Sequence, residues 1–354
     1  MSAGHGTLSR MRPALKPGLL PVWRDRDTLQ IGIDSRRAIA LTGMRSAAAV
    51  LGLLDGSRDR GQVIAAAADR GIQAEAADHV ITLLTAAGTV CDFPASTIAA
   101  VPDEARARLA AELATASLAH GDGDGGARVL ARRQGAVIRV HGPGQVGSGI
   151  ASLLAASGIG RVVSVGPAAP GPPPPAVEPG DWPPLMTSPA GPGRRAPGRK
   201  PPVTRSRAGK RPDLAVLVGS HDPEIASALV HDRIPHLAAS AGEAIGVVGP
   251  LVVAGRSACL RCLDLARSDR DPAWPLILAQ LAGRQPDPAA CDAPLAAAVA
   301  ALAAAQSLAF IDRPAEAGAT MNGTLELVLP DWQWRRRSLP PHRDCDCAGS
   351  RRPG

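Results

Sequence analysis

Four cysteines form two short motifs in the second half of the chain. Cys259 and Cys262 lie in a C-x-x-C sequence, and Cys345 and Cys347 lie in a C-x-C sequence near the C-terminus. Four thiolates from two distant segments are a common ligand set of a structural, tetrahedral zinc site, which leaves no open position for catalysis. The spacing therefore predicts that one Zn²⁺ ion joins the two segments and stabilises the fold.

Two alternatives stay open for these cysteines. His342 precedes Cys345 in a His-x-x-Cys spacing and is a substitute ligand, because one intervening residue makes it harder for Cys345 and Cys347 to reach the same ion. Some of the thiols could instead pair as a disulfide. The chain has 6 cysteines in 354 residues and shows no secretory leader. These features predict a reducing, cytoplasmic location and favour the metal site over a disulfide.

A glycine-rich turn follows a strand-like run at residues 136–140. Gly142, Gly144 and Gly147 form a G-x-G-x-x-G sequence, and an apolar helical stretch follows. Strand, glycine turn and helix together are typical of a site that holds a pyrophosphate on backbone N–H groups. The next strand-like run, residues 161–166, ends without the carboxylate that would hold a ribose. We therefore expect no nicotinamide cofactor.

Cys291 precedes a long apolar helical stretch, whose N-terminus could lower the pKa of the thiol. Asp292 beside it opposes thiolate formation, and no histidine lies nearby in the sequence to act as a base. Cys291 is therefore a weak candidate for a thioester-forming nucleophile, and a packed, unreactive cysteine is the favoured interpretation. Cys91 lies in a short apolar strand and is expected in the core.

The net charge of +7 is concentrated in one segment. Between residues 167 and 212 lie 8 arginines and lysines, 2 acidic residues and 15 of the 34 prolines. Such a composition cannot offset the entropy of ordering, so the segment is interpreted as a disordered insert and not as a nucleic-acid-binding arm. The apolar run Ala293–Ile311 is long enough to be tested as a membrane span. Because it is mostly alanine and contains Pro294 and Gln306, a core helix is favoured and no membrane is expected.

The first hundred residues predict a small domain of three strands and three helices. Strands are expected at 20–23, 29–34 and 38–41, helices at 45–54, 58–70 and 74–87, and a short strand at 89–92. Such a ribbon with three helices is winged-helix-like. The third predicted helix contains no arginine or lysine, which argues against DNA binding, because neutralised phosphates supply most of the affinity for DNA.

Residues 15–95 resemble the PqqD-like RiPP recognition element, through the ribbon and the sequence Leu53-Leu54-Asp55-Gly56-Ser57-Arg58. The resemblance implies binding of an extended leader peptide as an added strand. We expect this peptide near Ile31, Ile33 and Ile39 on the ribbon and near Val80 and Leu84 on the third helix. An accessory dimerisation domain is the alternative.

Residues 130–354 resemble the ThiF/MoeB adenylyltransferase superfamily, which is related to ubiquitin-activating enzymes. The glycine turn, the strand 214–218, the segment 246–250 and the two cysteine motifs occur in the expected order, and the sequence at 270–275 suggests the branch of azole-forming peptide cyclodehydratases. Active members bind ATP and Mg²⁺. They use an Asp after the second strand, and an Arg and a Lys beyond it. Here Val165 and Gly166 occupy the Asp region, and the insert replaces the next segment. Asp222 could be a surviving Mg²⁺ ligand, although alone it is insufficient.

The resemblances predict an α/β chain in three parts. These are a winged-helix-like peptide-recognition domain at 1–98, a helical linker at 99–134, and a Rossmann-like, ThiF-type domain at 135–354 with the insert at 167–212. The leading hypothesis is a degenerate ThiF-like protein that presents a leader peptide to a partner enzyme of the YcaO type. The first alternative is an active adenylyltransferase, in which His221 or Asp222 contacts phosphate or metal. The second is a structural protein that acts as a homodimer.

Overall fold

The computed structural model describes residues 11–43, 47–93, 107–142, 144–165, 211–219, 223–281, 290–315 and 318–348. The chain divides into two compact units, and each is described by itself. Unit 1 comprises Met1–Ala136 with Leu154–Gly160, and unit 2 comprises Val137–Leu153 with Arg161–Gly354. Most of the expected Pro/Arg-rich insert, as well as His221 and Asp222, lies outside the described residues.

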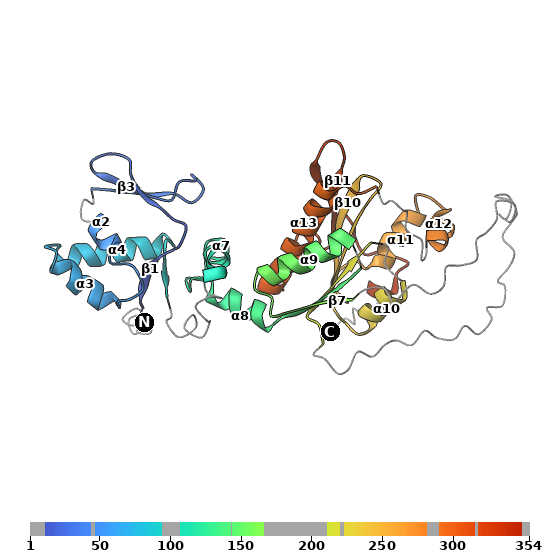
Figure 1. The fold of residues 1–354 in the computed structure, drawn as a ribbon, viewed down its shortest axis with the longest axis horizontal. Coiled ribbons are helices and arrows are strands. Elements are labelled where there is room, and N and C mark those ends of the chain that lie inside the picture. The colour runs from blue at the N-terminus through green and yellow to red at the C-terminus, as the bar shows by residue number, and fades with distance from the viewer. Residues whose placement is uncertain are drawn as a thin grey trace, which may run out of the picture. The chain divides into compact units, whose positions relative to one another are not determined.

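Unit 1 contains two small antiparallel sheets (Figure 1). Strands β2 (Pro21–Trp23), β3 (Thr28–Ile31) and β4 (Ile39–Thr42) form a meander in the order β2-β3-β4. Strand β1 (Pro13–Leu15) pairs with β5 (Val90–Asp92). The meander lies where the sequence predicted a ribbon. The pairing of β1 with β5 was not predicted, and it brings the two ends of the small domain together.

Three helices follow the meander: α2 (Ala47–Leu51), α3 (Arg60–Ala68) and α4 (Ala74–Ala86). Asp59 caps α3 by accepting from the Gln62 N–H, and the Gln62 side chain accepts from the Asp59 N–H in return. This reciprocal pair is a capping box, which satisfies two otherwise unpaired donors. Asp55 instead closes a turn by accepting from the N–H and hydroxyl of Ser57.

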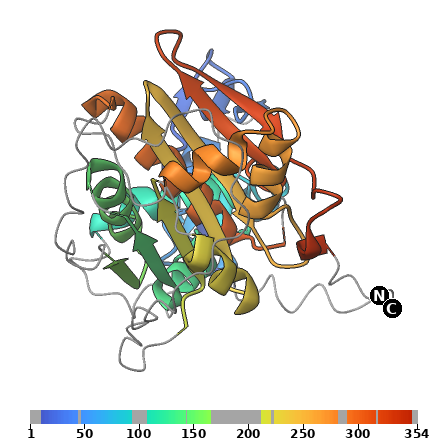
Figure 2. The ribbon, with the colours of Figure 1, turned by 90° about the vertical axis from the view of Figure 1, so that its right-hand side faces the viewer.

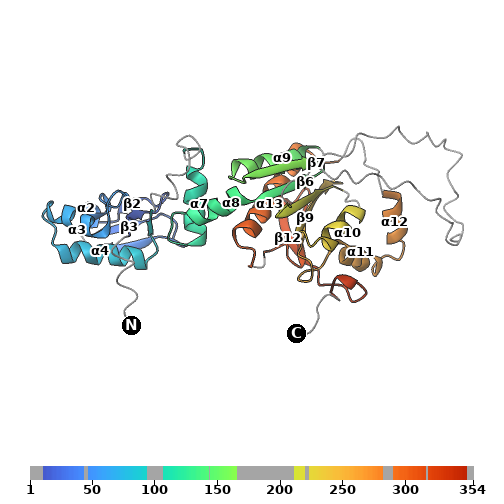
Figure 3. The same cartoon turned by 90° about the horizontal axis from the view of Figure 1, so that it is seen from below.

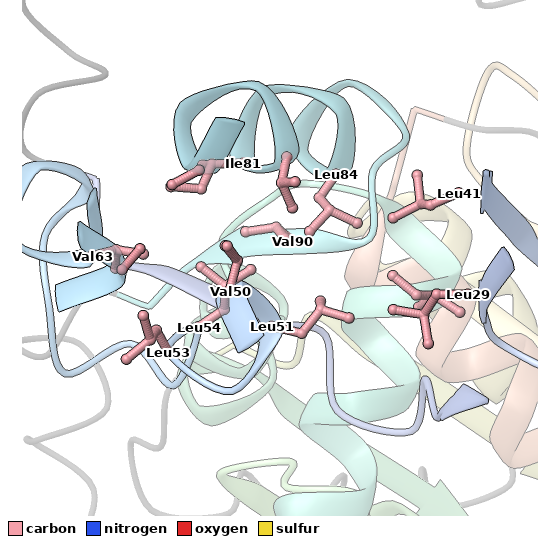
Figure 4. Close-up of a cluster of buried hydrophobic side chains, with 14 of the residues drawn as sticks. Leu29, Leu41, Val50, Leu51, Leu53, Leu54, Val63, Ile81, Leu84 and Val90 are labelled. Carbon is pink, nitrogen blue, oxygen red and sulfur yellow. The ribbon is translucent and has the colours of Figure 1, made fainter. Parts of the chain in front are cut away.

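The core of unit 1 lies between the meander and the helices, as Figure 4 shows. Every element from β3 to β5 contributes to it, because each presents an alternating or helical set of apolar side chains to the same volume. The labelled members are Leu29, Leu41, Val50, Leu51, Leu53, Leu54, Val63, Ile81, Leu84 and Val90.

Helices α7 (Ala110–His120) and α8 (Ala127–Gly135) belong to unit 1. The buried ammonium of Lys16, only 4% exposed, donates to the carbonyl of Ser117 at 3.2 Å, and Arg37 donates to the carbonyl of Leu118 at 2.6 Å. Both carbonyls lie in the last turn of α7, where helix carbonyls lack partners and attract cations. The segment expected as a linker is thus hydrogen-bonded to the residue after β1 and to the turn before β4.

Unit 2 is built on a seven-stranded mixed sheet in the order β12-β11-β10-β9-β8-β6-β7 (Figure 2). The parallel strands are β6 (Val137–His141), β7 (Arg161–Val165), β8 (Leu214–Val218) and β9 (His236–Gly242). The antiparallel strands are β10 (Ile245–Val252), β11 (Gly323–Val328) and β12 (Gln333–Ser338). The sheet confirms an α/β fold, whereas the winged-helix-like form of unit 1 stays a prediction.

Helices cover both faces of this sheet (Figures 1 and 3). Helices α9 (Gly144–Ala156) and α13 (Ala293–Asp312) lie on one face, and α10 (Pro223–His231) and α11 (Leu260–Ser268) lie on the other. A short helix, α12 (Trp274–Leu281), packs beside α11. Two glycines permit close contact: a Cβ on Gly149 would lie 3.0 Å from the Cβ of Ala300, and one on Gly246 would lie 2.5 Å from a methyl of Val299.

Helix α13 is long and apolar enough to cross a membrane, and it is the one helix of that kind among the described residues. Its contacts identify it as a core helix. It packs against β9 and β10, and Leu295, Val299, Ala303 and Ile311 are buried. Asp292 caps its N-terminus by accepting from the Leu295 N–H at 2.9 Å.

Replacing Gly246 with alanine should lower the free energy of unfolding by about 1–3 kcal/mol, because the new methyl overlaps Val299 in a packed core. Gly242→Ala is the matched control, since nothing lies within 4 Å of a Cβ there. Urea denaturation of both variants measures the difference. Equal stabilities would show that α13 can move away from the sheet at little cost.

Candidate functional site

The two cysteine motifs meet beside helix α11 in unit 2. Cys259 is the residue immediately before α11, and Cys262 lies in its first turn. Cys345 and Cys347 come from the C-terminal segment, which ends in a short 3₁₀ helix at Asp346–Ala348. The four sulfur atoms lie within 4.8 Å of one another, so residues more than eighty positions apart form one cluster.

The sulfur spacing suits a metal ion better than a disulfide. The distances are 3.8 Å for Cys259–Cys262, 3.6 Å for Cys259–Cys345 and 3.3 Å for Cys262–Cys347. Metal–sulfur bonds of about 2.3 Å in a tetrahedron place the sulfurs about 3.8 Å apart, whereas a disulfide needs about 2.05 Å. None of the six cysteines, all of which the structure describes, forms a disulfide. The four residues could therefore hold a metal ion.

The environment of the cluster is largely closed. Cys259, Cys262 and Cys345 are buried, and they belong to an apolar cluster with Leu217, Leu229 and Leu339. Backbone hydrogen bonds hold the segments in place: the Ala258 N–H donates to the Asn322 side chain at 2.8 Å, and the Leu339 N–H donates to the Asn322 carbonyl at 2.9 Å. A buried ligand set of this kind serves structure and not catalysis.

Burial controls the ionisation of these thiols. It raises the pKa of Cys259 to about 11, and it also raises the pKa of Cys347. Burial opposes ionisation of Cys262 as well, but backbone N–H groups of His342 and Cys259 outweigh it and lower the pKa of that thiol. Without a metal ion the cluster thus retains protons that metal binding must displace.

His342 is not a fourth ligand in this arrangement. Its Nε2 lies 2.9 Å from an Asp269 carboxylate oxygen, and its Nδ1 accepts from the Asp344 N–H at 3.1 Å. Its backbone N–H donates to the Cys262 sulfur at 3.3 Å. Both ring nitrogens are therefore engaged elsewhere, and His342 orients a thiolate through its main chain, a role that outer residues commonly have at metal sites.

The glycine-rich turn joins β6 to α9, as the sequence pattern predicts. A Cβ on Gly142 would lie 2.6 Å from the Val218 carbonyl oxygen, and one on Gly147 would lie 2.4 Å from the Gly142 carbonyl oxygen. Gly144 has room for a Cβ but has φ +88°, which favours glycine. The turn brings strand and helix close together, and the α9 N-terminus leaves backbone donors for an anion.

The residues beside the turn fit a nucleotide only in part. His141, the last residue of β6, has a buried Nε2 without a hydrogen-bond partner in the described structure, and burial lowers its pKa, so it is neutral at pH 7. Val165 ends β7 where the resemblance implies a carboxylate. Lys16, the lysine of the described residues, is buried in unit 1. Backbone donors for phosphate are present, whereas the residues that the structure describes beside the turn do not include the expected lysine and carboxylate.

Two other cysteines are placed clearly. Cys291 is half-buried immediately before the Asp292 N-cap, and burial followed by the Asp292 charge raises its thiol pKa. That shift opposes a nucleophilic role. Cys91 is fully buried in β5, as expected. The candidate Mg²⁺ ligand Asp222 lies outside the described residues.

The expected peptide-contacting residues fall into two groups. Ile31, Val80 and Leu84 are at most 1% exposed and belong to the core of unit 1, so their side chains are unavailable to a peptide on the folded domain. Ile33 is 73% exposed in the turn after β3, and Ile39 is half-buried at the start of β4. The resemblance to a peptide-recognition element suggested all five, and an apolar sequence pattern does not distinguish a core side chain from a docking one.

Unit 1 also exposes apolar residues that the sequence did not single out as contacts. Leu20, Val22 and Trp23 lie at or next to β2 and are all exposed. The paired positions place Trp23 opposite Leu29, on the face that covers the core, but at the outer edge of the meander. Its position at an edge strand explains the exposure.

Known structures share this arrangement. A heterocyclase in complex with substrate and cofactor matches at a TM-score of 0.62 with 15% identity, over 93% of this chain and 38% of that chain. The heterocyclase TruD matches at 0.60 with 14% identity, over 95% and 42%. E. coli MccB with AMPCPP and MccA matches at 0.60 with 15% identity, over 95% and 99%.

The chain has the fold of MccB and TruD. At these identities the likeness establishes the fold alone, and it confirms at that level the resemblance to ThiF/MoeB-like proteins of the cyclodehydratase branch. This chain spans about two fifths of the two heterocyclases, 38% and 42%, and 99% of MccB. No protein-family model and no curated protein sequence matches the chain.

Replacing Cys345 with serine should abolish stoichiometric metal binding and lower the melting temperature, because the remaining three ligands cannot complete the tetrahedron. Cys291→Ser is the control, since that thiol lies outside the cluster. Elemental analysis and thermal unfolding measure both effects. Full metal content in the Cys345→Ser protein would contradict the four-cysteine site.

Zinc affinity of the metal-free protein should rise with pH. The Cys259 thiol has a pKa of about 11, so it is protonated throughout the range from pH 6 to 8 and must lose its proton on binding. The affinity should therefore increase by about tenfold or more per pH unit. Competition with a chromophoric chelator at several pH values measures it, and an affinity independent of pH would exclude thiolate ligands.

Proposed function

We propose that this protein binds a precursor peptide through unit 1 and presents it to a separate modifying enzyme, while unit 2 is a ThiF-like body held together by a structural Zn²⁺ ion. The observation that carries the proposal is the fold of the whole chain. It spans both units and is shared with MccB, which has been determined with MccA, and with a heterocyclase determined with substrate.

The meander of unit 1 supports peptide binding. In the described part of the chain, β2 and β4 each have one edge without a paired strand. An added peptide strand on β4 would gain main-chain hydrogen bonds. Ile39 at the start of β4 and Ile33 in the turn that precedes it supply accessible apolar contacts. We assign to unit 1 the peptide-recognition role that the sequence predicts for residues 1–98.

The residues beside the glycine turn support the need for a partner enzyme. The cations and carboxylate expected at a nucleotide site are missing from the described residues beside the turn. We therefore assign ATP-dependent modification to a second protein, of the YcaO type implied by the resemblance.

One observation favours adenylation by the chain itself as the alternative. The MccB structures include one with ATP, and the α9 N-terminus and the unpaired Nε2 of His141 offer polar groups beside the turn. In this reaction a peptide carboxylate would attack the α-phosphate of bound ATP, which forms the acyl adenylate and releases pyrophosphate. ATP–pyrophosphate exchange stimulated by a peptide carboxylate decides between the two functions: exchange that depends on Gly144 would establish the alternative, and no exchange is expected here.

The double variant Ile33→Asp/Ile39→Asp should weaken leader-peptide binding by about tenfold or more, because charges replace desolvated apolar contacts. Fluorescence anisotropy with a labelled candidate precursor peptide measures it. Leu276→Asp is the matched control, since Leu276 is an exposed apolar residue in unit 2. Undiminished binding by the double variant would remove the site from β4.

A further inference from the structure

Strand β12 is an exposed edge of the seven-stranded sheet. It pairs with β11 on one side, and no strand of the described residues pairs with its other side. All six of its residues, Gln333–Ser338, are exposed. Its outer N–H and C=O groups therefore form a row available for another extended chain.

The hairpin of β11 and β12 also carries exposed tryptophans. The whole sequence has 5 tryptophans, 2 phenylalanines and no tyrosine. Two of these seven, Trp332 and Trp334, lie in or next to β12 and are 44% and 37% exposed. Trp332 also has φ +53°, a conformation that is unfavourable for a bulky side chain. An exposed, strained tryptophan is unexpected unless it has a contact to make.

The charges of β12 are ordered by face. Arg335 and Arg337 lie on one face, where they pair with Asp331 and Glu326. Arg336 lies on the other face and donates to the carbonyls of Ala319, Met321 and Asn322. The hairpin thus holds three arginines and two carboxylates. Within the described residues, the hydrogen-bond partners of the Arg336 guanidinium are neutral carbonyl and hydroxyl groups.

These charges decide which chain can occupy the edge. A second copy of this chain could pair its own β12 antiparallel to this one. If the middle residues of the two strands are aligned, arginine lies opposite or diagonal to arginine, which is unfavourable. A strand with carboxylates at alternating positions would instead face Arg335 and Arg337 from one side. Protection of the edge against aggregation explains arginines alone, but it does not explain two adjacent exposed tryptophans.

We propose that β12 is a docking edge for an extended acidic segment of a partner polypeptide, which adds as an eighth strand, with Trp332 and Trp334 covering its apolar side chains. This surface is distinct from the peptide edge of unit 1. It goes beyond the proposed function, because it identifies where a second polypeptide attaches to unit 2.

The probe is a fluorescein-labelled decapeptide of alternating glutamate and valine, titrated with the full chain at low salt. We expect saturable binding with a dissociation constant below about 1 mM, weakened by added salt. The same peptide with alternate backbone nitrogens methylated keeps its charges but cannot complete a strand. It should bind at least about tenfold more weakly.

The protein variants are Arg335→Gln/Arg337→Gln and Trp334→Ala, each with circular dichroism to verify folding. Both should weaken binding by about tenfold. Arg256→Glu/Arg270→Glu is the control for general charge, since both residues are exposed elsewhere in unit 2.

No saturable binding, equal binding of a lysine–valine decapeptide, or equal binding of the methylated peptide would overturn the proposal. Loss of binding in Ile33→Asp/Ile39→Asp instead would place the probe on unit 1, which would refute this site and leave the proposed function standing.

Discussion

The contact between the C-x-x-C and C-x-C motifs is the constraint on which the architecture of unit 2 depends. The sulfur cluster joins the start of α11 to the segment that follows β12. Between the two motifs in the sequence lie α12, α13 and the β11–β12 hairpin. A metal ion closing this loop would restrict the unfolded chain and add binding free energy that exists only in the folded state. The apolar cluster around the sulfurs excludes water from the same place.

Unit 2 has the glycine-rich turn of a nucleotide-binding fold, whereas Val165 stands at the end of β7, where the resemblance implies a carboxylate. Gly142 and Gly147 are needed because backbone atoms approach within 2.6 Å of where their side chains would begin. That requirement comes from packing and persists whether or not a phosphate binds. Glycine spacing alone therefore indicates the shape of the turn. Nucleotide chemistry in such a fold depends in addition on cations and carboxylates outside the turn.

Several features of the structure could be predicted from particular residues. The cysteine spacing anticipated the sulfur cluster, and the glycine pattern located the junction of β6 and α9. The long alanine-rich segment anticipated α13. The glycine pattern and the alanine-rich segment are signals within a short stretch of sequence, and cysteine pairs at this spacing have few roles other than metal binding. The pairing of β1 with β5 could not be predicted, because Pro13–Leu15 is too short to show alternation. Ile31, Val80 and Leu84 were assigned to a peptide, although a half-buried helix or strand shows the same apolar periodicity when its partner is its own core.

The hydrogen bonds of Lys16 and Arg37 to α7 have a consequence for how the N-terminal strands and helices can be separated from the chain. A fragment ending near residue 98 would keep both cations but lose the carbonyls of Ser117 and Leu118 that receive them. The Lys16 ammonium would then be hydrated only by exposing the apolar surroundings in which it is held. A segment inherited or transplanted by recombination would accordingly carry α7 with it, and its boundary would lie beyond the three helices α2, α3 and α4.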